Sequence, residues 1–251
     1  MLTAPEMARY ARHLPLAQIG PAGQERLRAA RVLVVGAGGL GSPVLLYLAA
    51  AGVGVIGVVD FDTVAESNLQ RQVIYTASDL GQPKAACAAQ KLQAMNPGVT
   101  ARAHQVALTA SNASAIISGY DVVVDCVDNY PARYLVNDTC AALGLPDVHG
   151  SISQCAGQVS VFQAGHGPCY RCLYPQTPPA GMWPNCADAG VLGVLPGVIG
   201  AIQATEALKL IVGGGDPLIG RVLLYDAWSM RFRELELAKD PHCLGCADPP
   251  M

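Results

Sequence analysis

A glycine-rich turn is the first place in the sequence where residue types and spacing could do chemistry. Its glycines are Gly36, Gly38, Gly39 and Gly41. Backbone without side chains can approach a phosphate closely, and the N-terminus of a following helix offers N–H donors and the positive end of the helix dipole. Asp60 closes the next predicted strand, where a carboxylate accepts from ribose hydroxyls. The pattern favours nucleotide binding over a purely structural turn, but it does not distinguish NAD from ATP.

Two cations downstream of these glycines favour a nucleotide with several phosphates. Arg71 lies in SNLQRQ and Lys84 ends GQPK. Such cations suit a triphosphate, whereas a nicotinamide enzyme has no need of them there. Asp128 follows the predicted strand 121–126, and a carboxylate at that edge of an open α/β sheet can hold Mg²⁺ against phosphate oxygens. Each residue alone could be a solvated charge or a turn residue, but their order after the glycines indicates ATP.

Two Cys-x-x-Cys pairs carry a second kind of chemistry. They are Cys169 with Cys172 and Cys243 with Cys246, about 70 residues apart. Two such pairs complete a tetrahedral Zn²⁺ site, in which four sulfurs fill the coordination shell, so the metal is expected to be structural and to clip the C-terminal part onto the body. A redox dithiol is the alternative, which the presence of two pairs disfavours. The nine cysteines are an odd number without a secretory signal, which argues against a disulfide framework.

Cys186 stands apart from these pairs. It follows a proline-rich loop, residues 175–184, and precedes a predicted helix. A thiol at a helix entry could have a lowered pKa and act as a nucleophile. The alternative is a buried small apolar side chain, which is the commoner state of a free cysteine. The remaining cysteines are expected in the core: Cys87, Cys126, Cys140 and Cys155.

The elements that must position these residues alternate between strand and helix in the first half of the chain. The predicted strands are 32–35, 53–59, 99–106 and 121–126, and the predicted helices are 42–51, 84–95 and 132–143. This order is typical of a Rossmann-like, doubly wound parallel sheet in an α/β fold. In the second half, shorter strands at 158–163 and 221–225 flank a helix at 198–212. We expect that half to continue the same sheet with mixed or antiparallel strands.

The predicted organisation is one domain, 1–251. It divides into N-terminal helices (1–30), a nucleotide-binding half (31–150) and a carrier-binding and zinc half (151–251). Hydrophobic residues make up 51% of the chain and charged residues 14%, which suits a large core. The net charge of -3 indicates neither nucleic acid nor an anionic membrane as a partner. The longest apolar run, 189–202, contains Pro196 and is shorter than the roughly 20 residues of a membrane span. With no signal peptide recognised, we expect a cytoplasmic protein.

The motifs together resemble one known family. The segments GAGGLGS, DFDTV, SNLQRQ, GQPK, DCVDN, CYRCL, NCADAGV and the terminal CLGC resemble, in order and over nearly the whole chain, the MoeB/ThiF family. These are the adenylyltransferases of molybdopterin and thiamine sulfur transfer, relatives of the ubiquitin-activating enzymes. The resemblance implies a homodimer, Mg²⁺ with ATP, and structural zinc. It also implies a ubiquitin-like sulfur-carrier partner ending in Gly-Gly, whose carboxylate attacks the α-phosphate to form an acyl-adenylate and release pyrophosphate.

Site residues follow from the same resemblance. Gly39 and Asp60 are expected to bind the nucleotide, and Asp128 to bind Mg²⁺. Arg12 resembles an arginine that the family lends across the dimer to the partner's active site; from the residues alone, a surface helix charge is the simpler interpretation. The residues expected to hold or neutralise phosphates are Asn68, Arg71 and Lys84. The full set expected around the nucleotide is Gly36, Gly38, Gly39, Gly41, Asp60, Asp62, Ser67, Asn68, Gln70, Arg71, Lys84, Asp128 and Asn129.

Three departures from the family pattern bear on the site. His13 stands where the family commonly has Gln. Asp147 and His149 lie in a strand that is usually apolar, where they could form a satisfied buried pair or line the channel for the carrier tail; we favour the pair. The loop before Cys186 is rich in proline, and its length does not decide between the thiamine branch, in which the matching cysteine links covalently to the carrier, and the molybdopterin branch, in which it is dispensable. No sulfurtransferase domain follows Cys246, so a separate protein is expected to supply sulfur.

Three rival functions remain open at this level. A Rossmann oxidoreductase using NAD leaves the SNLQRQ segment and the cysteine pairs unexplained. A non-catalytic nucleotide-binding scaffold is disfavoured by the joint presence of Arg12, Arg71, Lys84 and Asp128. A relative that adenylates a peptide or another carrier in a secondary pathway is not excluded, because partner choice depends on the surface. The sequence therefore predicts an adenylyltransferase and leaves the pathway open.

Overall fold

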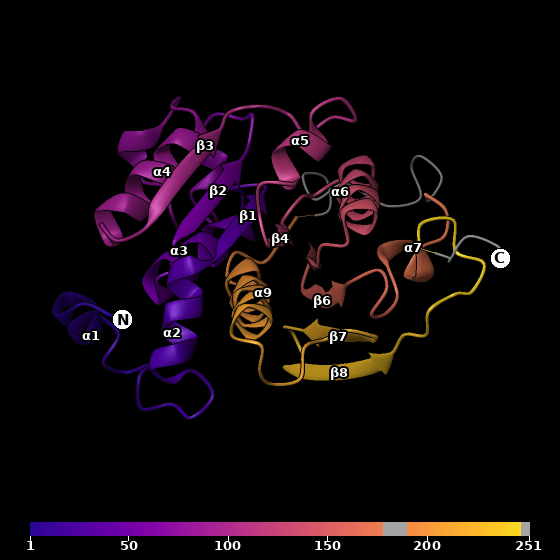
Figure 1. Ribbon diagram of the computed structural model, residues 1–251. Helices are drawn as coiled ribbons and strands as arrows, with labels where there is room; N and C mark the ends of the chain where they lie inside the picture. The colour runs from indigo at the N-terminus through magenta and orange to yellow at the C-terminus, as the bar shows by residue number, and fades with distance from the viewer. Residues whose placement is uncertain (178–189, 247–251) are drawn as a thin grey trace.

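An eight-stranded mixed sheet organises the protein, for which a computed structural model describes residues 1–177 and 190–246. In the order in which they lie side by side, the strands are β3 (Thr100–His104), β2 (Val55–Val59), β1 (Arg31–Val35), β4 (Val122–Asp125), β5 (Asp147–Ser153), β6 (Ala156–Phe162), β7 (Arg221–Asp226) and β8 (Arg231–Glu236). The first five are parallel, and β6, β7 and β8 join antiparallel. The predicted change from a parallel to an antiparallel half is confirmed (Figure 1).

Helices cover both faces of the sheet. They are α1 (Ala4–Arg9), α2 (Gly20–Ala29), α3 (Gly41–Ala51), α4 (Lys84–Met95), α5 (Ala113–Ile117), α6 (Tyr130–Leu143), α7 (Tyr170–Leu173) and α9 (Leu195–Val212), with short 3-10 turns η1 (Glu66–Asn68) and η2 (Ala77–Asp79). Val32 and Val34 pack with α2, α3, α4 and α9, whereas Leu33 and Val35 pack with α5 and α6. Successive side chains of a strand point to opposite faces, so a strand covered on both sides is apolar at every position. Figure 1 shows α6 and α9 on opposite sides of β4 and β6.

Helix α9 joins the two halves of the fold. It packs against α2 and α3 and also against β4, β5 and β6. A Cβ atom at Gly200 would lie 2.5 Å from the Pro43 side chain and 2.8 Å from the Leu40 carbonyl oxygen, so the absence of a side chain lets α9 and α3 approach this closely. By length and composition alone α9 could cross a membrane, but half of that stretch is buried inside the protein. Its apolar composition is accounted for by this packing.

The predicted strands and helices of the first half agree with the structure to within two residues at each end. One difference is that β2 begins at Val55, because Gly52 ends α3 in the left-handed conformation (φ 84°) and a turn follows. The strand β8 was not predicted. All six of its residues are exposed, so it has no apolar pattern, and it forms by pairing with β7. Edge strands with charged side chains are common because they resist further pairing.

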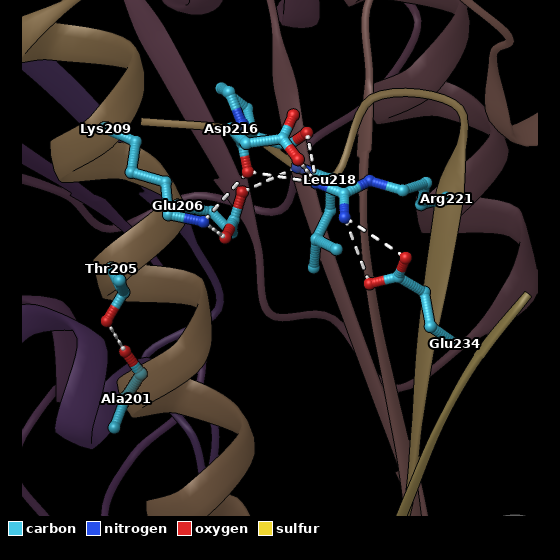
Figure 2. A network of polar contacts seen from close by, with 9 residues as sticks. Ala201, Thr205, Glu206, Lys209, Asp216, Leu218, Arg221 and Glu234 are labelled. Carbon is cyan, nitrogen blue, oxygen red and sulfur yellow. Dashed lines mark hydrogen bonds and ion pairs between the residues drawn. The ribbon is translucent and has the colours of Figure 1, made fainter. Parts of the chain in front are cut away.

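A polar network fixes the connection between α9 and β7 (Figure 2). The Glu206 carboxylate is buried and accepts a hydrogen bond from the Leu218 backbone N–H at 2.8 Å. Its other oxygen pairs with Lys209, whose ammonium group also donates to the Asp216 carbonyl. Arg221, at the start of β7, bonds to the same carbonyl and pairs with Asp216. The buried Leu218 N–H in this loop is therefore satisfied by the Glu206 side chain of α9.

We predict that Glu206→Ala lowers the free energy of unfolding by about 1–3 kcal/mol, because the buried Leu218 N–H loses its acceptor. Glu234→Ala is the matched control: it removes an exposed carboxylate that pairs with Arg221, and a loss of about 0–1 kcal/mol is expected. Urea unfolding at one fixed protein concentration measures both. Equal losses in the two variants would contradict the distinction between the buried and the exposed carboxylate.

Candidate nucleotide and carrier site

A cavity of about 400 Å³ lies at the carboxyl ends of β1, β2 and β4. In an open α/β sheet this edge is where ligands bind, at the point where the strand order changes direction. The cavity walls include Gly36, Gly38, Gly39, Asp60, Asp62, Arg71, Lys84, Asp128 and Asn129. The structure thus brings together, at one edge of the sheet, residues that lie in five separate segments of the sequence.

The glycine turn is shaped by its closeness to the end of β4. Gly36 adopts φ 95°, and a Cβ atom there would lie 2.8 Å from the Cys126 carbonyl oxygen, so only glycine fits. The Ala37 N–H is taken by the Asp60 carboxylate at 2.8 Å, and the Ala37 carbonyl accepts from the Tyr75 hydroxyl at 2.9 Å. These bonds fix the turn, and Gly38 and Gly39 line the cavity just before α3 begins.

Asp60 lies under the glycine turn and at the cavity wall. One carboxylate oxygen accepts from the Asp62 N–H and the other from the Ala37 N–H, both at 2.8 Å. Burial raises the pKa of Asp60, and these N–H donors together with Lys84 counter that effect because they favour the charged form. Each oxygen can still accept a second bond. The carboxylate is therefore placed both to hold the turn and to accept from a ribose hydroxyl.

The two predicted phosphate-binding cations also line the cavity. Lys84 is the first residue of α4 and is only 5% exposed, with its ammonium nitrogen 3.0 Å from an Asp62 oxygen. Arg71 is half-buried and donates to the Ser67 carbonyl at 3.0 Å. A buried ammonium group facing a cavity is costly unless it is paired. Asp62 supplies this pairing in the protein itself, and a phosphate would supply it with a ligand.

Asp128 and Asn129 form the opposite wall. Asp128 is exposed into the cavity, and Asn129 donates to its carboxylate at 3.4 Å. The Asn129 side-chain oxygen accepts from the Ala132 N–H at 3.0 Å, so Asn129 is the N-cap of α6. An accessible carboxylate oxygen at this place has the donor chemistry that Mg²⁺ prefers. The residues present therefore fit a magnesium ion carried by a nucleotide.

Several residues expected at the nucleotide lie outside the cavity wall. These are Gly41, Ser67, Asn68 and Gln70. Arg12, which was expected to reach the active site of a partner copy, also lies outside this wall. The Asn68 side chain accepts from the Ala65 N–H at 3.2 Å and thereby caps η1. Ser67 and Asn68 therefore shape the turn that carries Arg71. Arg12 is exposed, and no hydrogen bond or ion pair to it is found within residues 1–177 and 190–246.

Sequence reasoning missed other wall residues. Gln72 is 4% exposed, lines the cavity, and has a buried side-chain oxygen without a partner among the described residues. Its place in SNLQRQ, next to Arg71, was the available signal. Arg133, one turn into α6, also lines the wall. Part of the apolar lining comes from Val106, Ala107 and Leu108, a segment after β3 whose composition gave no indication of a site.

The preferred pairing of Asp147 with His149 is wrong. Both residues are buried, but His149 bonds through Nδ1 to Asp125 at 2.8 Å. Asp147 retains an oxygen without a partner among the described residues. The reason is strand geometry: Asp125 on β4 is the residue in register with His149 on β5, whereas Asp147 is two positions away on the same strand.

A second cavity, of about 830 Å³, adjoins the first along β5, β6, β7 and the start of α6. Five residues line both: Asp128, Asn129, Pro131, Arg133 and Ile152. The walls of the second cavity also include Tyr170 and Tyr174 near α7, and Arg231 and Arg233 on β8. A linear chain end lying in this groove would therefore reach the shared wall at Asp128.

The two Cys-x-x-Cys pairs converge as predicted. The four sulfur atoms lie within 4.8 Å of one another, and Cys169–Cys243 and Cys172–Cys246 are each 3.5 Å apart. A tetrahedral zinc site with Zn–S bonds of about 2.3 Å requires sulfur separations of about 3.8 Å, so the arrangement fits. Burial raises the pKa of Cys246 to about 11, so a metal would have to displace the thiol proton.

The other cysteines differ in burial. Cys87, Cys126 and Cys140 are buried as expected, whereas Cys155 is half-buried. Cys186 lies outside the described residues.

Comparison with known proteins agrees with this architecture. The ThiF family model matches residues 10–245. The chain is 54% identical over 99% of its length to a sulfur carrier protein adenylyltransferase of Thermus thermophilus, 93% of which is covered. It is 51% identical over 96% of its length to the probable adenylyltransferase/sulfurtransferase MoeZ of Mycobacterium tuberculosis, but it spans only 62% of that protein.

Solved structures show the same fold at low sequence identity. E. coli MccB, crystallised with MccA-N7isoASN, superposes with a TM-score of 0.85 at 21% identity, over 96% of this chain and 75% of that one. The glycine turn, the cations and carboxylates around the cavity, the paired cysteines and the family match lead to one conclusion: the chain belongs to the ThiF family.

Proposed function

We propose that the protein is an ATP-dependent adenylyltransferase that activates the C-terminal carboxylate of a small ubiquitin-like sulfur-carrier protein. One observation carries the proposal: the first cavity, beside the glycine turn, and the second cavity, the groove along β5 to β8, share the wall around Asp128 and Arg133. A nucleotide in the first and a chain end in the second would meet at that wall. The names of the relatives in Thermus and Mycobacterium support this reaction class.

The nucleotide half of the reaction is assigned to residues of the first cavity. Gly38, Gly39 and Asp60 would hold the nucleotide by backbone N–H groups and the ribose-facing carboxylate. Arg71 and Lys84 would pair with phosphates, with Lys84 exchanging Asp62 for a phosphate oxygen. When bound, Mg²⁺ neutralises charge on the phosphates, and Asp128 would hold it there.

The carrier half is assigned to the groove. Its aromatic and polar walls suit an extended backbone, and a terminal Gly-Gly has no side chains to obstruct the place where the groove meets the first cavity. Arg133, Arg231 and Arg233 give the groove positive charge, which favours an incoming carboxylate. A carboxylate oxygen would attack the α-phosphorus of ATP. The bond from the α-phosphorus to the oxygen that bridges to the β-phosphate would break, leaving acyl-adenylate and pyrophosphate. The nucleophile is already ionised, so positioning and charge stabilisation do most of the catalysis.

The wider setting belongs to the same proposal. Arg12 would complete the site of a second copy in a homodimer, which accounts for an exposed arginine away from its own cavity. The four-cysteine cluster would hold structural Zn²⁺. Cys186 would serve as a thiol nucleophile if the carrier is of the thiamine type, and a separate sulfurtransferase or cysteine desulfurase would supply sulfur. The carrier is of the molybdopterin synthase small-subunit type or of the thiamine type, and we place the protein in the cytoplasm.

The test is carrier-dependent ATP–pyrophosphate exchange with each of the two carrier types, repeated with a carrier lacking its terminal glycine. Exchange with one intact carrier only, and none with the shortened one, is the expected result. Cys186→Ala run in parallel reveals whether a thiol-sensitive carrier adduct forms. Absence of exchange with both carriers, in protein that binds ATP, would instead favour another peptide terminus or a scaffold role.

We predict that Asp128→Ala lowers pyrophosphate exchange by about 100-fold or more, because it removes the carboxylate proposed to hold Mg²⁺ beside the phosphates. The exposed position of Asp128 leaves folding unaffected. Asp216→Ala, which removes a carboxylate on the α9–β7 loop, is the control and should exchange normally. Normal exchange in Asp128→Ala would refute the assigned role.

We also predict that Cys172→Ser lowers bound zinc and the melting temperature together, since the tetrahedral site loses one of four thiolates. Cys155→Ser, which alters a half-buried cysteine outside the cluster, should change neither. Metal content by atomic emission and thermal unfolding provide the two readings. An unchanged zinc content in Cys172→Ser would contradict a four-cysteine site.

A further inference from the structure

We infer that the buried pair Asp125–His149 positions Asp128 for metal binding by fixing the peptide group of Val127. The inference rests on the proposed function, because it concerns the carboxylate there assigned to Mg²⁺. It makes His149 a positioning residue, which acts through Asp125 and touches neither nucleotide nor carrier.

The geometry centres on the Asp125 carboxylate at the end of β4. One oxygen accepts from the Val127 N–H at 3.0 Å, and the other accepts from His149 Nδ1 at 2.8 Å. Both side chains are 1% exposed, so water does not compete for these bonds. With each oxygen held, the carboxylate has one orientation, and the N–H of Val127 has one direction. Asp128 is the next residue.

The neighbouring backbone is held as well. The Val127 carbonyl accepts from Arg133 at 3.4 Å, and the Cys126 N–H donates to the Val35 carbonyl at 2.9 Å. Gln203 on α9 donates to the Asp125 carbonyl at 2.8 Å. The turn between β4 and α6 is therefore tied at every residue that precedes Asp128. Asp128 then reaches the cavity as the exposed end of a rigid segment.

The His149 ring is itself fixed by packing. Its centroid lies 5.0 Å from that of Tyr170 and 5.6 Å from that of Phe162. Burial lowers the pKa of His149 despite the adjacent Asp125, so the ring is neutral at neutral pH. A neutral imidazole has one N–H, and the carboxylate at Nδ1 accepts it. His149 thus supplies a single directed donor, which is what orienting a carboxylate requires.

The end of β2 offers a built-in comparison. Asp60 also accepts from the N–H two residues ahead, that of Asp62, and its second oxygen is held by the Ala37 backbone N–H. At the ends of both β2 and β4, a buried carboxylate therefore orients a turn. The turn after β2 carries Asp62 to the cavity wall, and the turn after β4 carries Asp128 there. At β4 the second donor is a side chain, because β5 lies alongside and places His149 in register with Asp125. This makes the β4 turn open to test by substitution.

Three variants separate the hydrogen bond from simple packing. His149→Leu fills the site but removes the donor, whereas His149→Asn restores an N–H near the position of Nδ1. Asp147→Asn is the matched control: it lies on the same strand, is equally buried, and makes no hydrogen bond to the Val127 peptide among the described residues. Cooperative urea unfolding shows which variants fold.

The first reading is the gain in ATP affinity on adding Mg²⁺, measured by calorimetry with Mg²⁺ and with a chelator. The second is the kcat of pyrophosphate exchange. For His149→Leu we expect the Mg²⁺-dependent gain and kcat to fall about 10- to 100-fold, which is the usual effect of losing a residue that orients a metal ligand, while ATP affinity without metal stays unchanged. His149→Asn should recover most of both readings, and Asp147→Asn should match the unmodified protein.

Folded His149→Leu with an unchanged Mg²⁺-dependent gain would overturn the inference. Equal losses in the Leu and Asn variants would also overturn it, since the shared change would then be the loss of the imidazole and not of the donor. An Asp147→Asn loss as large as that of His149→Leu would show general disruption of the buried layer and would likewise reject the positioning role. The calorimetric measurement needs no carrier. If carrier-dependent exchange fails, the proposed function is rejected, and the calorimetry still decides whether His149 positions Asp128.

Discussion

The close approach of the glycine turn to the end of β4 is the constraint on which the rest of the site depends. A side chain at Gly36 would collide with the Cys126 carbonyl, so the turn after β1 and the turn after β4 lie in contact. That contact brings Gly38, Gly39 and Asp128 to the lining of the same cavity. The contact between the two turns follows from the strand order, because β1 lies between β2 and β4 and all three strands end at the same edge of the sheet.

Buried carboxylates hold the turns at this edge in place, and charged side chains face the cavity beside them. The carboxylate oxygens of Asp60 and Asp125 accept from backbone N–H groups and one imidazole, so these buried oxygens have hydrogen-bond partners. Lys84 is held in place by Asp62. Arg71 and Asp128, which are less buried than Lys84, therefore extend into the cavity from turns that are already fixed. Preorganisation of this kind is what electrostatic catalysis at a phosphate needs.

The antiparallel half gives the edge its second cavity. Strand β5 is the last parallel strand, and its turn into β6 carries the sheet on to β7 and β8, which form the wall of the groove. The paired cysteines connect α7 to residues near the C-terminus beside this wall, with Arg171 of α7 bonded to Asp138 of α6. The first cavity and the groove are thus both built on the same eight-stranded sheet, and they share part of their lining.

The sequence by itself determined the parallel half, the glycine turn and the cysteine pairing, because each depends on local apolar runs, on glycine at a fixed offset, or on the spacing of two ligands. It also indicated Arg71, Lys84 and Asp128 by their order. Only the tertiary structure decided the partner of His149, the exposed strand β8, and the walls formed by Gln72 and Val106 to Leu108. Those features depend on register between strands and on contact between distant segments, and neither leaves a periodic signal in the chain.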